Sequence, residues 1–406
     1  MPARPEAALS RRRFLHLAAA GAAAAAGGGM VVLSSCGEPT GPGPGGWSRS
    51  PLGAPTTVPA SGASLVPAPG IATIGIGASS PAWLFNGVLP GPTLRARRDE
   101  QARIRLINGL PEPTIVHWHG LLVPEEADGH PRYAIGPGET YDYVFPLVQR
   151  AGTFWYHPHP HHRTAGQIHR GLAGFFLVTD DKEDALGLPA GPREILLVLQ
   201  DREGDPDLAF QYAPTGADLH TGMLRDVSYG NGIRLPTLAV SGARYRFRVL
   251  NASQARVYRL ALADGAPLTV IGNDGGLLPA PTEVDSVYLG IGERVDLLVD
   301  FAGHAPGTRL MLGSLPFSLP SAPGGGTPQG AAMDLLELVR GPGPAESAPP
   351  LPGVLSPVPS LGTPLAERTF LLRSTAHGDL HQINGRSFDM DRVDERIPLG
   401  QVERWV

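Results

Sequence analysis

Cysteine is almost absent from this chain, because Cys36 is the only one among 406 residues. A single cysteine excludes an intramolecular disulfide. After this position the chain offers no thiolate, either as a metal ligand or as a nucleophile. Any metal bound by the rest of the chain must therefore be held by histidine, carboxylate or thioether.

Charge is also scarce. Only 17% of the residues are charged, the formal net charge is −5, and lysine occurs once, at Lys182. After the first residues no run of basic residues follows, so we expect no nucleic-acid partner. The hydrophobic fraction of 42% is ordinary for a protein that buries a core, and the length suits two or three domains.

A sustained apolar run occurs only near the N-terminus. Residues 10–15, "SRRRFL", carry paired arginines, and a run rich in alanine and glycine follows as far as Leu33. This pattern predicts a twin-arginine export signal over residues 1–36, since the run is too short and too small-sided for a membrane-spanning helix. We therefore expect a periplasmic or cell-envelope protein.

The end of this leader leaves two alternatives open. The sequence "LSSC", which ends at Cys36, resembles a lipoprotein processing site. A lipid on Cys36 would then be the only anchor to the inner membrane. The other reading is a leader that is cut elsewhere and releases a protein without a lipid.

Glycine and proline, at 53 and 43 residues, interrupt the chain every few positions. Such punctuation favours many short strands joined by turns and predicts an all-β fold. Residues 37–69 are rich in Gly, Pro, Ser and Thr and are predicted to be a disordered tether.

An internal repeat follows the tether. Asn-Gly pairs begin at Asn86, Asn231 and Asn384, and each opens a turn that leads into an alternating strand such as "ARIRLIN" or "RYRFRVLN". A period this long predicts repeated domains, each a β-sandwich or barrel. The predicted boundaries are 70–185 for domain 1, 186–345 for domain 2, 346–366 for a linker and 367–406 for the start of a third domain.

Two His-x-His pairs stand out among 13 histidines: His117 and His119 in "VHWHG", and His157 and His159 in "TFWYHPHPHH". Side chains two apart on a strand share one face, roughly 7 Å from each other. Two such pairs on neighbouring strands would place four imidazoles around a small volume. Neutral imidazole binds copper, zinc, iron and nickel, so this spacing predicts a metal site without naming the metal.

The motifs around these pairs resemble those of the multicopper oxidases, the family of laccases, bilirubin oxidases and bacterial copper-efflux oxidases. The resemblance rests on "HWHG" at residues 117–120 and "WYHPHPHHRTAGQIHRGLAG" at residues 155–174. It extends to "NGRSFDM" and "GQVERW" near the C-terminus. It implies tandem cupredoxin-like Greek-key domains, two complete and the start of a third.

The resemblance also implies roles for single residues. His117 matches a ligand of the type 2 copper, whereas His119, His157 and His159 match ligands of the type 3 coppers. Asp128, in "EEADGHP", matches an acidic residue that feeds protons to dioxygen in related enzymes; the other reading is a solvated loop aspartate. The remaining histidines, among them His130, His161, His162 and His169, are expected to be outer or surface residues.

The chain departs from the family in one respect. The type 1 copper site, which needs two histidines and a cysteine, and the second half of the cluster ligands are absent from these 406 residues. His117 lies 31 residues after Asn86, and the same interval counted from Asn384 passes Val406. We therefore expect that the chain stops before the remaining copper motifs, and that alone it is inactive.

The implied function is oxidation of phenolic or metal-ion substrates, one electron at a time, coupled to four-electron reduction of dioxygen to water. The segment "STAHGDLHQING" contains no methionine, which favours a laccase-like enzyme over a dedicated cuprous oxidase. Two alternatives stay open. One is a copper-free structural relative of the cell-division type, and the other is a mononuclear zinc hydrolase that uses three of the four histidines.

Overall fold

The structure is a computed structural model that describes residues 49–318, 329–374 and 381–406. The predicted leader, Cys36 and the first part of the predicted tether lie outside these residues. Strands account for 46% of the residues and helices for 7%, so the predicted all-β fold is confirmed. Among the described helices, none combines the length and the apolar character needed to cross a bilayer.

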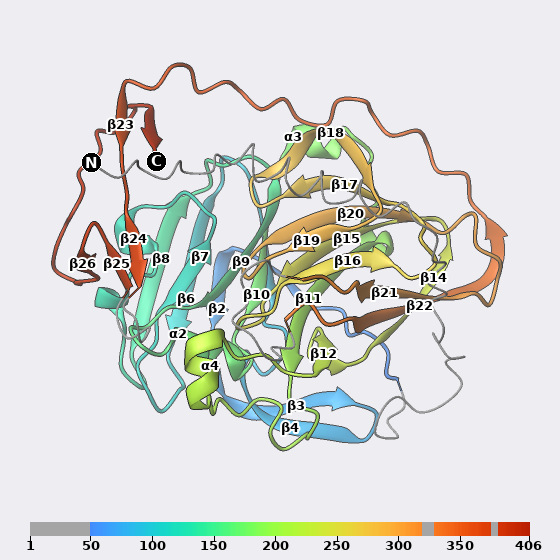
Figure 1. The fold of residues 1–406 in the computed structure, drawn as a ribbon, viewed down its shortest axis with the longest axis horizontal. Helices are drawn as coiled ribbons and strands as arrows, with labels where there is room; N and C mark the ends of the chain where they lie inside the picture. The colour runs from blue at the N-terminus through green and yellow to red at the C-terminus, as the bar shows by residue number, and fades with distance from the viewer. Residues whose placement is uncertain (1–48, 319–328, 375–380) are drawn as a thin grey trace, which may run out of the picture. The chain divides into compact units, whose positions relative to one another are not determined.

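The first β-unit, residues 57–179, contains two sheets whose inner faces share an apolar core (Figure 1). Strand β6 shows the reason, because its sequence QARIRLI alternates and buries Ala102, Ile104 and Leu106 while the arginines stay exposed. One sheet has the order β1 (Thr57–Pro59), β5 (Thr93–Arg97), β10 (Gly174–Thr179), β9 (Gly152–Pro158) and β7 (Val116–His119). The other has the order β2 (Ser61–Leu65), β6 (Gln101–Ile107) and β8 (Thr140–Pro146), and β3 (Pro67–Gly75) pairs with β4 (Ala78–Phe85).

The prediction of a disordered tether is wrong for its last part. Strand β1 pairs in parallel with β5, and β2 pairs in parallel with β6. Ala60 and Leu65 are fully buried in the core of the first β-unit. The segment is ordered by strand pairing and by a few small apolar contacts, which a composition dominated by Gly, Pro, Ser and Thr does not reveal.

The second β-unit, residues 194–345, repeats the two-sheet arrangement around its own core. Leu197 on β11, Phe247 on β15 and Leu338 on β22 are among the buried residues. The larger sheet has the order β13 (Ile233–Arg234), β12 (Val227–Gly230), β11 (Glu194–Arg202), β15 (Arg244–Asn251), β20 (Arg294–Asp300), β17 (Leu268–Asn273) and β18 (Gly276–Val284). The smaller has the order β14 (Thr237–Gly242), β22 (Met333–Ala345), β21 (Arg309–Ser314), β16 (Tyr258–Leu262) and β19 (Val287–Leu289).

The two β-units share a smaller apolar cluster. Trp155 and Phe175, on β9 and β10, pack with Leu196 and Val198 of β11 and with Leu250 of β15. Strand β9 is therefore covered on both faces, and all seven of its residues are buried. The short helices lie in connections: α2 (Thr164–His169), α3 (Asp181–Asp184), α4 (Gly216–Thr221), η1 (Glu125–Ala127), η2 (Pro131–Tyr133) and η3 (Gly191–Arg193).

The three Asn-Gly turns have one conformation. Asn86, Asn231 and Asn384 have φ angles of +54°, +50° and +52°. In each, the asparagine Oδ1 accepts a hydrogen bond from a backbone N–H. The asparagine Nδ2 donates to the carbonyl of the residue two positions before that N–H. These partners are Val66 and Ser64, Val198 and Leu196, and Leu371 and Thr369. The same hydrogen-bond pattern thus recurs in all three turns, as expected for repeated units.

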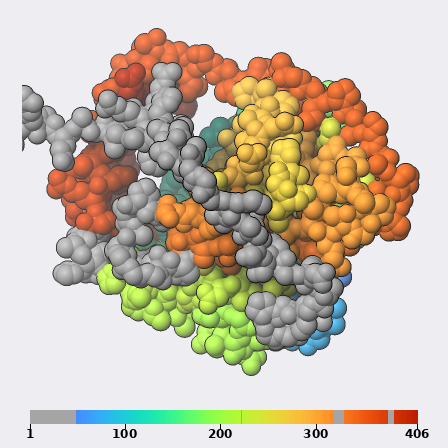
Figure 2. Space-filling model, turned by 45° about the vertical axis from the view of Figure 1, so that its right-hand side comes forward, coloured from blue at the N-terminus to red at the C-terminus, as the bar shows by residue number. Residues whose placement is uncertain are grey.

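After β22 the chain runs along the second β-unit without helix or strand until residue 366. The Leu355 N–H donates to the Pro279 carbonyl at 2.9 Å, and Figure 2 shows red-orange atoms of this segment beside the yellow-to-orange second β-unit. Two small sheets follow, β23 (Ala366–Arg368) with β27 (Glu403–Trp405), and β24 (Leu372–Ser374) with β25 (His381–Ile383) and β26 (Arg386–Ser387). The predicted boundaries of the second and third domains stay predictions.

Candidate metal centre

Strands β7 and β9 carry the predicted ligands on one face. They pair antiparallel, with His117 directly opposite His157. Because side chains alternate along a strand, Trp118 and Tyr156 point into the apolar core. His117, His119 and His157 therefore lie together on the opposite face, as the two-residue spacing predicted.

These three histidines form a compact group of nitrogen donors. One ring nitrogen from each lies within 4.8 Å of the others. His119 Nδ1 is 3.3 Å from His157 Nε2. His157 Nδ1 is 3.0 Å from the carbonyl of Pro158, which can only accept a hydrogen bond, so Nδ1 carries the proton and Nε2 keeps the lone pair. His157 thus presents an unprotonated nitrogen on the side of His119.

His117 is oriented by the main chain of Asp128. Its Nδ1 donates to the Asp128 carbonyl at 2.7 Å, and the Asp128 carboxylate is 3.4 Å from the same nitrogen. Gly129 makes this approach possible, because it has φ +77° and a Cβ there would stand 2.1 Å from the Val116 carbonyl oxygen. Asp128 therefore lies beside the histidine group.

His159 lies at the edge of the group. It follows the last residue of β9, and its N–H donates to the Ile115 carbonyl at 2.8 Å. Its ring centroid is 5.4 Å from that of His117 and 5.9 Å from that of His157. Of the four predicted ligands, the structure thus brings three into one group and leaves the fourth beside it.

Burial favours the neutral form of His119, His157 and His159. It lowers the pKa of His119 to about 4, with smaller contributions from the charge of Arg294 and from His117. Burial also lowers the pKa of His157 well below its ordinary value and lowers that of His159. A neutral imidazole is the form that binds a metal ion, so protons compete little with a metal at neutral pH.

Two further side chains support the group. Trp155 stacks against His119 and His157, with ring centroids 5.0 and 4.3 Å apart. Gln167 is fully buried; it accepts from the Thr114 hydroxyl at 2.8 Å and donates to the Pro113 carbonyl at 2.9 Å. It thereby ties α2 to the segment that leads into β7.

The other histidines near the motifs have different surroundings. His161 and His162 are exposed and stack on each other at 3.7 Å. His169, expected at the surface or in an outer position, is buried at 2% exposure because it ends α2 against the ring of Tyr212. The motif pattern gave no signal for this burial, because His169 lies outside the two His-x-His pairs.

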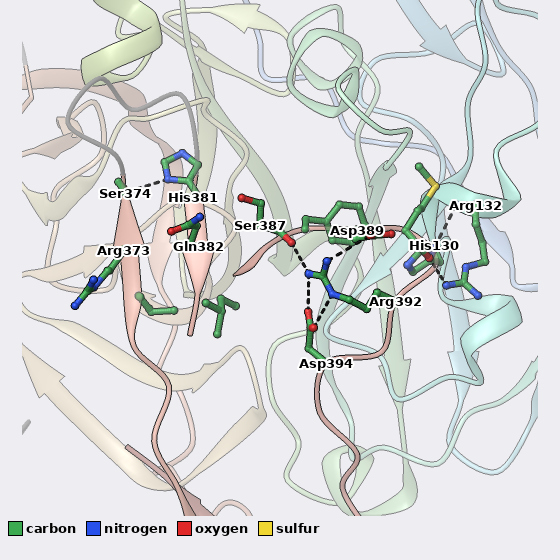
Figure 3. A pocket seen from close by; sticks show the side chains of 14 residues that line it. His130, Arg132, Arg373, Ser374, His381, Gln382, Ser387, Asp389, Arg392 and Asp394 are labelled. Atoms are coloured by element: carbon green, nitrogen blue, oxygen red, sulfur yellow. Dashed lines mark hydrogen bonds and ion pairs between the residues drawn. The ribbon is translucent and has the colours of Figure 1, made fainter. Parts of the chain in front are cut away.

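The first strands after the linker contact the loops of the first β-unit. Phe388 packs against the rings of His130 and His161, and Arg132 donates to the Met390 carbonyl. Between them lies a cavity of about 630 Å³, lined on one side by η2 and on the other by β24 to β26 (Figure 3). The segment that starts the predicted third domain therefore contacts the loops that carry His130 and His161.

The donor set fits a transition metal. Three imidazole nitrogens at this spacing suit copper or zinc, and the described residues near them include no thiolate. A carbonyl fixes the second nitrogen of His117 and of His157, which is the outer-sphere arrangement that orients ligating histidines.

Known proteins resemble this chain along most of its length. Two family models, both described as multicopper oxidase, match residues 70–183 and 214–323. A laccase of Bacillus stratosphericus is 33% identical over 366 residues, which cover 80% of this chain and 71% of that protein. The cell division protein FtsP of Salmonella typhi is 33% identical over 337 residues, which cover 81% of this chain and 69% of FtsP.

A solved structure shows the same likeness in three dimensions. The McoA multicopper oxidase of Aquifex aeolicus superposes with a TM-score of 0.75 at 33% sequence identity. The superposition covers 84% of this chain and 75% of McoA.

Proposed function

The chain belongs to the multicopper oxidase family, and from this premise we propose that His117, His119, His157 and His159 supply half of a copper cluster that reduces dioxygen to water. The electrons come, one at a time, from phenolic or metal-ion substrates. The observation that carries the proposal is the group of three imidazole nitrogens within 4.8 Å on β7 and β9.

Different residues of the chain are proposed for metal binding, proton transfer and exclusion of water. His117, His119 and His157 would hold the metal through ring nitrogens, and His159 would add a ligand from the edge. Copper, when bound, supplies the one-electron transfer chemistry that these side chains lack. The Asp128 carboxylate is half-exposed and 3.4 Å from His117, so it can pass protons between solvent and the site. Trp155 covers His119 and His157 and keeps water from that side.

The experiment that tests this proposal offers copper and zinc together to the metal-free chain. We expect copper to be retained in preference to zinc, because affinity for nitrogen donors is higher for copper in the divalent series. Retention of zinc alone would favour a mononuclear zinc hydrolase. A chain that retains neither metal would favour the second candidate function, a copper-free structural relative of the cell-division type; the similarity to the cell division protein FtsP is the observation that favours it.

The copper-loaded chain of 406 residues is expected to show no intense blue absorption and no oxidation of phenols by dioxygen. The blue band needs a cysteine thiolate on copper, and Cys36, the only cysteine, belongs to the predicted leader. Visible absorption and oxygen uptake check both points. A blue preparation that consumes oxygen would require a copper site with a different ligand set.

We also propose export by the twin-arginine route. Replacing Arg11 and Arg12 by lysine is expected to leave the precursor in the cytoplasm, because that route reads the arginine pair. Fractionation followed by immunoblotting measures the result, and normal export of the variant would contradict it. Labelling with a radioactive fatty acid tests Cys36 in the same cells, since only lipidation transfers the label.

A further inference from the structure

The turn before β20 in the second β-unit reaches the predicted ligand His119. Gly292 has φ +73°, and a Cβ at this position would lie 3.2 Å from His119 Cε1 and 3.6 Å from His119 Nε2. It would also lie 3.7 Å from the ring of Trp155. A side chain at position 292 would therefore crowd the Cε1–Nε2 edge of the His119 ring.

Arg294 fixes this turn to the strand that carries His157. Its side chain is buried, at 2% exposure. Nε donates to the Thr153 carbonyl on β9 at 3.0 Å, and one terminal nitrogen donates to the Gly292 carbonyl at 2.9 Å. The same nitrogen is 3.0 Å from the carboxylate of Asp274. One guanidinium thus sets the distance between the turn and β9.

His119 is held differently from its two neighbours. A main-chain carbonyl orients the ring of His117 and another orients that of His157. Within the part of the chain that the structure describes, the one hydrogen-bond contact of the His119 side chain is its Nδ1 approach to His157. Packing must therefore set the rotation of its ring. Trp155 stacks on one side, and Gly292 closes the edge.

We propose that Gly292 and Arg294 are positioning residues for His119. They hold the ring so that Nδ1 faces the shared metal point, and they do so from the second β-unit. The second β-unit therefore takes part in shaping the site. The inference rests on the proposed copper function for its meaning, but the contact itself concerns residues of this chain alone.

The test uses Gly292→Ala in the full chain, with Gly265→Ala as a matched control. Gly265 also belongs to the second β-unit and has φ +79°, but a Cβ there meets nothing within 4 Å. Both variants suffer the same backbone strain, and only Gly292→Ala crowds His119. In the metal-free protein we expect the ¹³Cε1–¹Hε1 resonance of His119, assigned with His119→Gln, to move in Gly292→Ala alone. Copper(II) affinity is expected to fall about tenfold in the same variant.

A second variant covers the case in which Gly292→Ala fails to fold. Arg294→Lys keeps the charge but loses the fork that joins Thr153 to Gly292, so the His119 resonance should move and copper affinity should fall again. Arg340→Lys is the control, since Arg340 is also buried and donates to the carbonyls of Gly341 and Gly343.

The positioning role of Gly292 and Arg294 and the proposed copper function can be contradicted separately. An unmoved His119 resonance in both Gly292→Ala and Arg294→Lys overturns the inference, whatever the metal affinity. A wild-type chain that binds no copper overturns the proposed function, while the metal-free resonance still reports on the positioning.

Discussion

Replacing His157 and His159 together by alanine is expected to lower copper(II) affinity by roughly a hundredfold or more. Loss of an outer-sphere partner already costs ten- to hundredfold, and this variant removes two of the proposed ligands. His157 Nε2 is 3.3 Å from His119 Nδ1, so its removal leaves His119 without the nearest companion donor. Isothermal titration of the metal-free chain with copper(II) measures the loss.

The matched control is the double variant His161→Ala with His162→Ala. It also removes two imidazole side chains from the same motif. His161 and His162, however, are exposed and contact each other, with ring centroids 3.7 Å apart. We expect its copper affinity to match that of the wild type, and circular dichroism should show both variants folded. If the control loses binding and the His157 variant keeps it, the wrong pair has been assigned to the metal.

The largest effect on stability is expected from Arg248→Met, with a loss of roughly 3–5 kcal/mol in the free energy of unfolding. Arg248 is buried at 1% exposure and lies near three carboxylates. It donates to Glu194 at 2.7 Å, to Glu183 at 3.1 Å and to Asp296 at 3.1 Å. Methionine fills a similar volume but leaves buried negative charges without this partner.

The state of Asp296 explains why the charges matter at neutral pH. Burial alone would raise the pKa of this carboxyl, but Arg248 and Arg246 more than offset it, and the pKa lies below its ordinary value. A lowered carboxyl pKa adds stability above the unfolded pKa, and this stability is lost as the pH falls through the folded pKa. The full contribution is therefore present at pH 7, where urea denaturation should be measured.

An exposed pair provides the comparison. Arg105 donates to both oxygens of Asp142, at 2.7 and 2.9 Å, but both side chains are more than half exposed. Arg105→Met is expected to leave the free energy of unfolding nearly unchanged, because water screens the pair. An equally small change for Arg248→Met would mean that the buried carboxylates find other partners, and the assigned network would be wrong.

The histidine face could be predicted because it depends on local rules. A two-residue spacing on strands places His117 with His119, and the flanking aromatic residues indicate strands. The position of Asp128 followed only from resemblance, and Gly129 shows why the loop can come so close. The repeat also had a local signal, since Asn-Gly favours turns with positive φ at both residues.

Other features had no local signal. Gly292 and Arg294 lie far along the chain from His119, and only the packing of two β-units brings them together. His159 lies beside the group because β9 ends before it, and the end of a strand depends on its pairing partner. Strands β1 and β2 form from a segment poor in large apolar residues, so their order comes from the edge strands they join.

The odd and even positions of β9 face opposite sides of the strand. Tyr156 and Phe154 belong to the core of the first β-unit, and His157 and Trp155 to the opposite face. A slip of the strand by one residue would exchange the two sets, burying His157 in the core and turning Tyr156 toward the site. The apolar residues therefore fix the register of β9, and with it the positions of the proposed ligands, without any metal. Because the selecting and the binding residues are separate, descendants of this fold could lose every ligand and keep their shape.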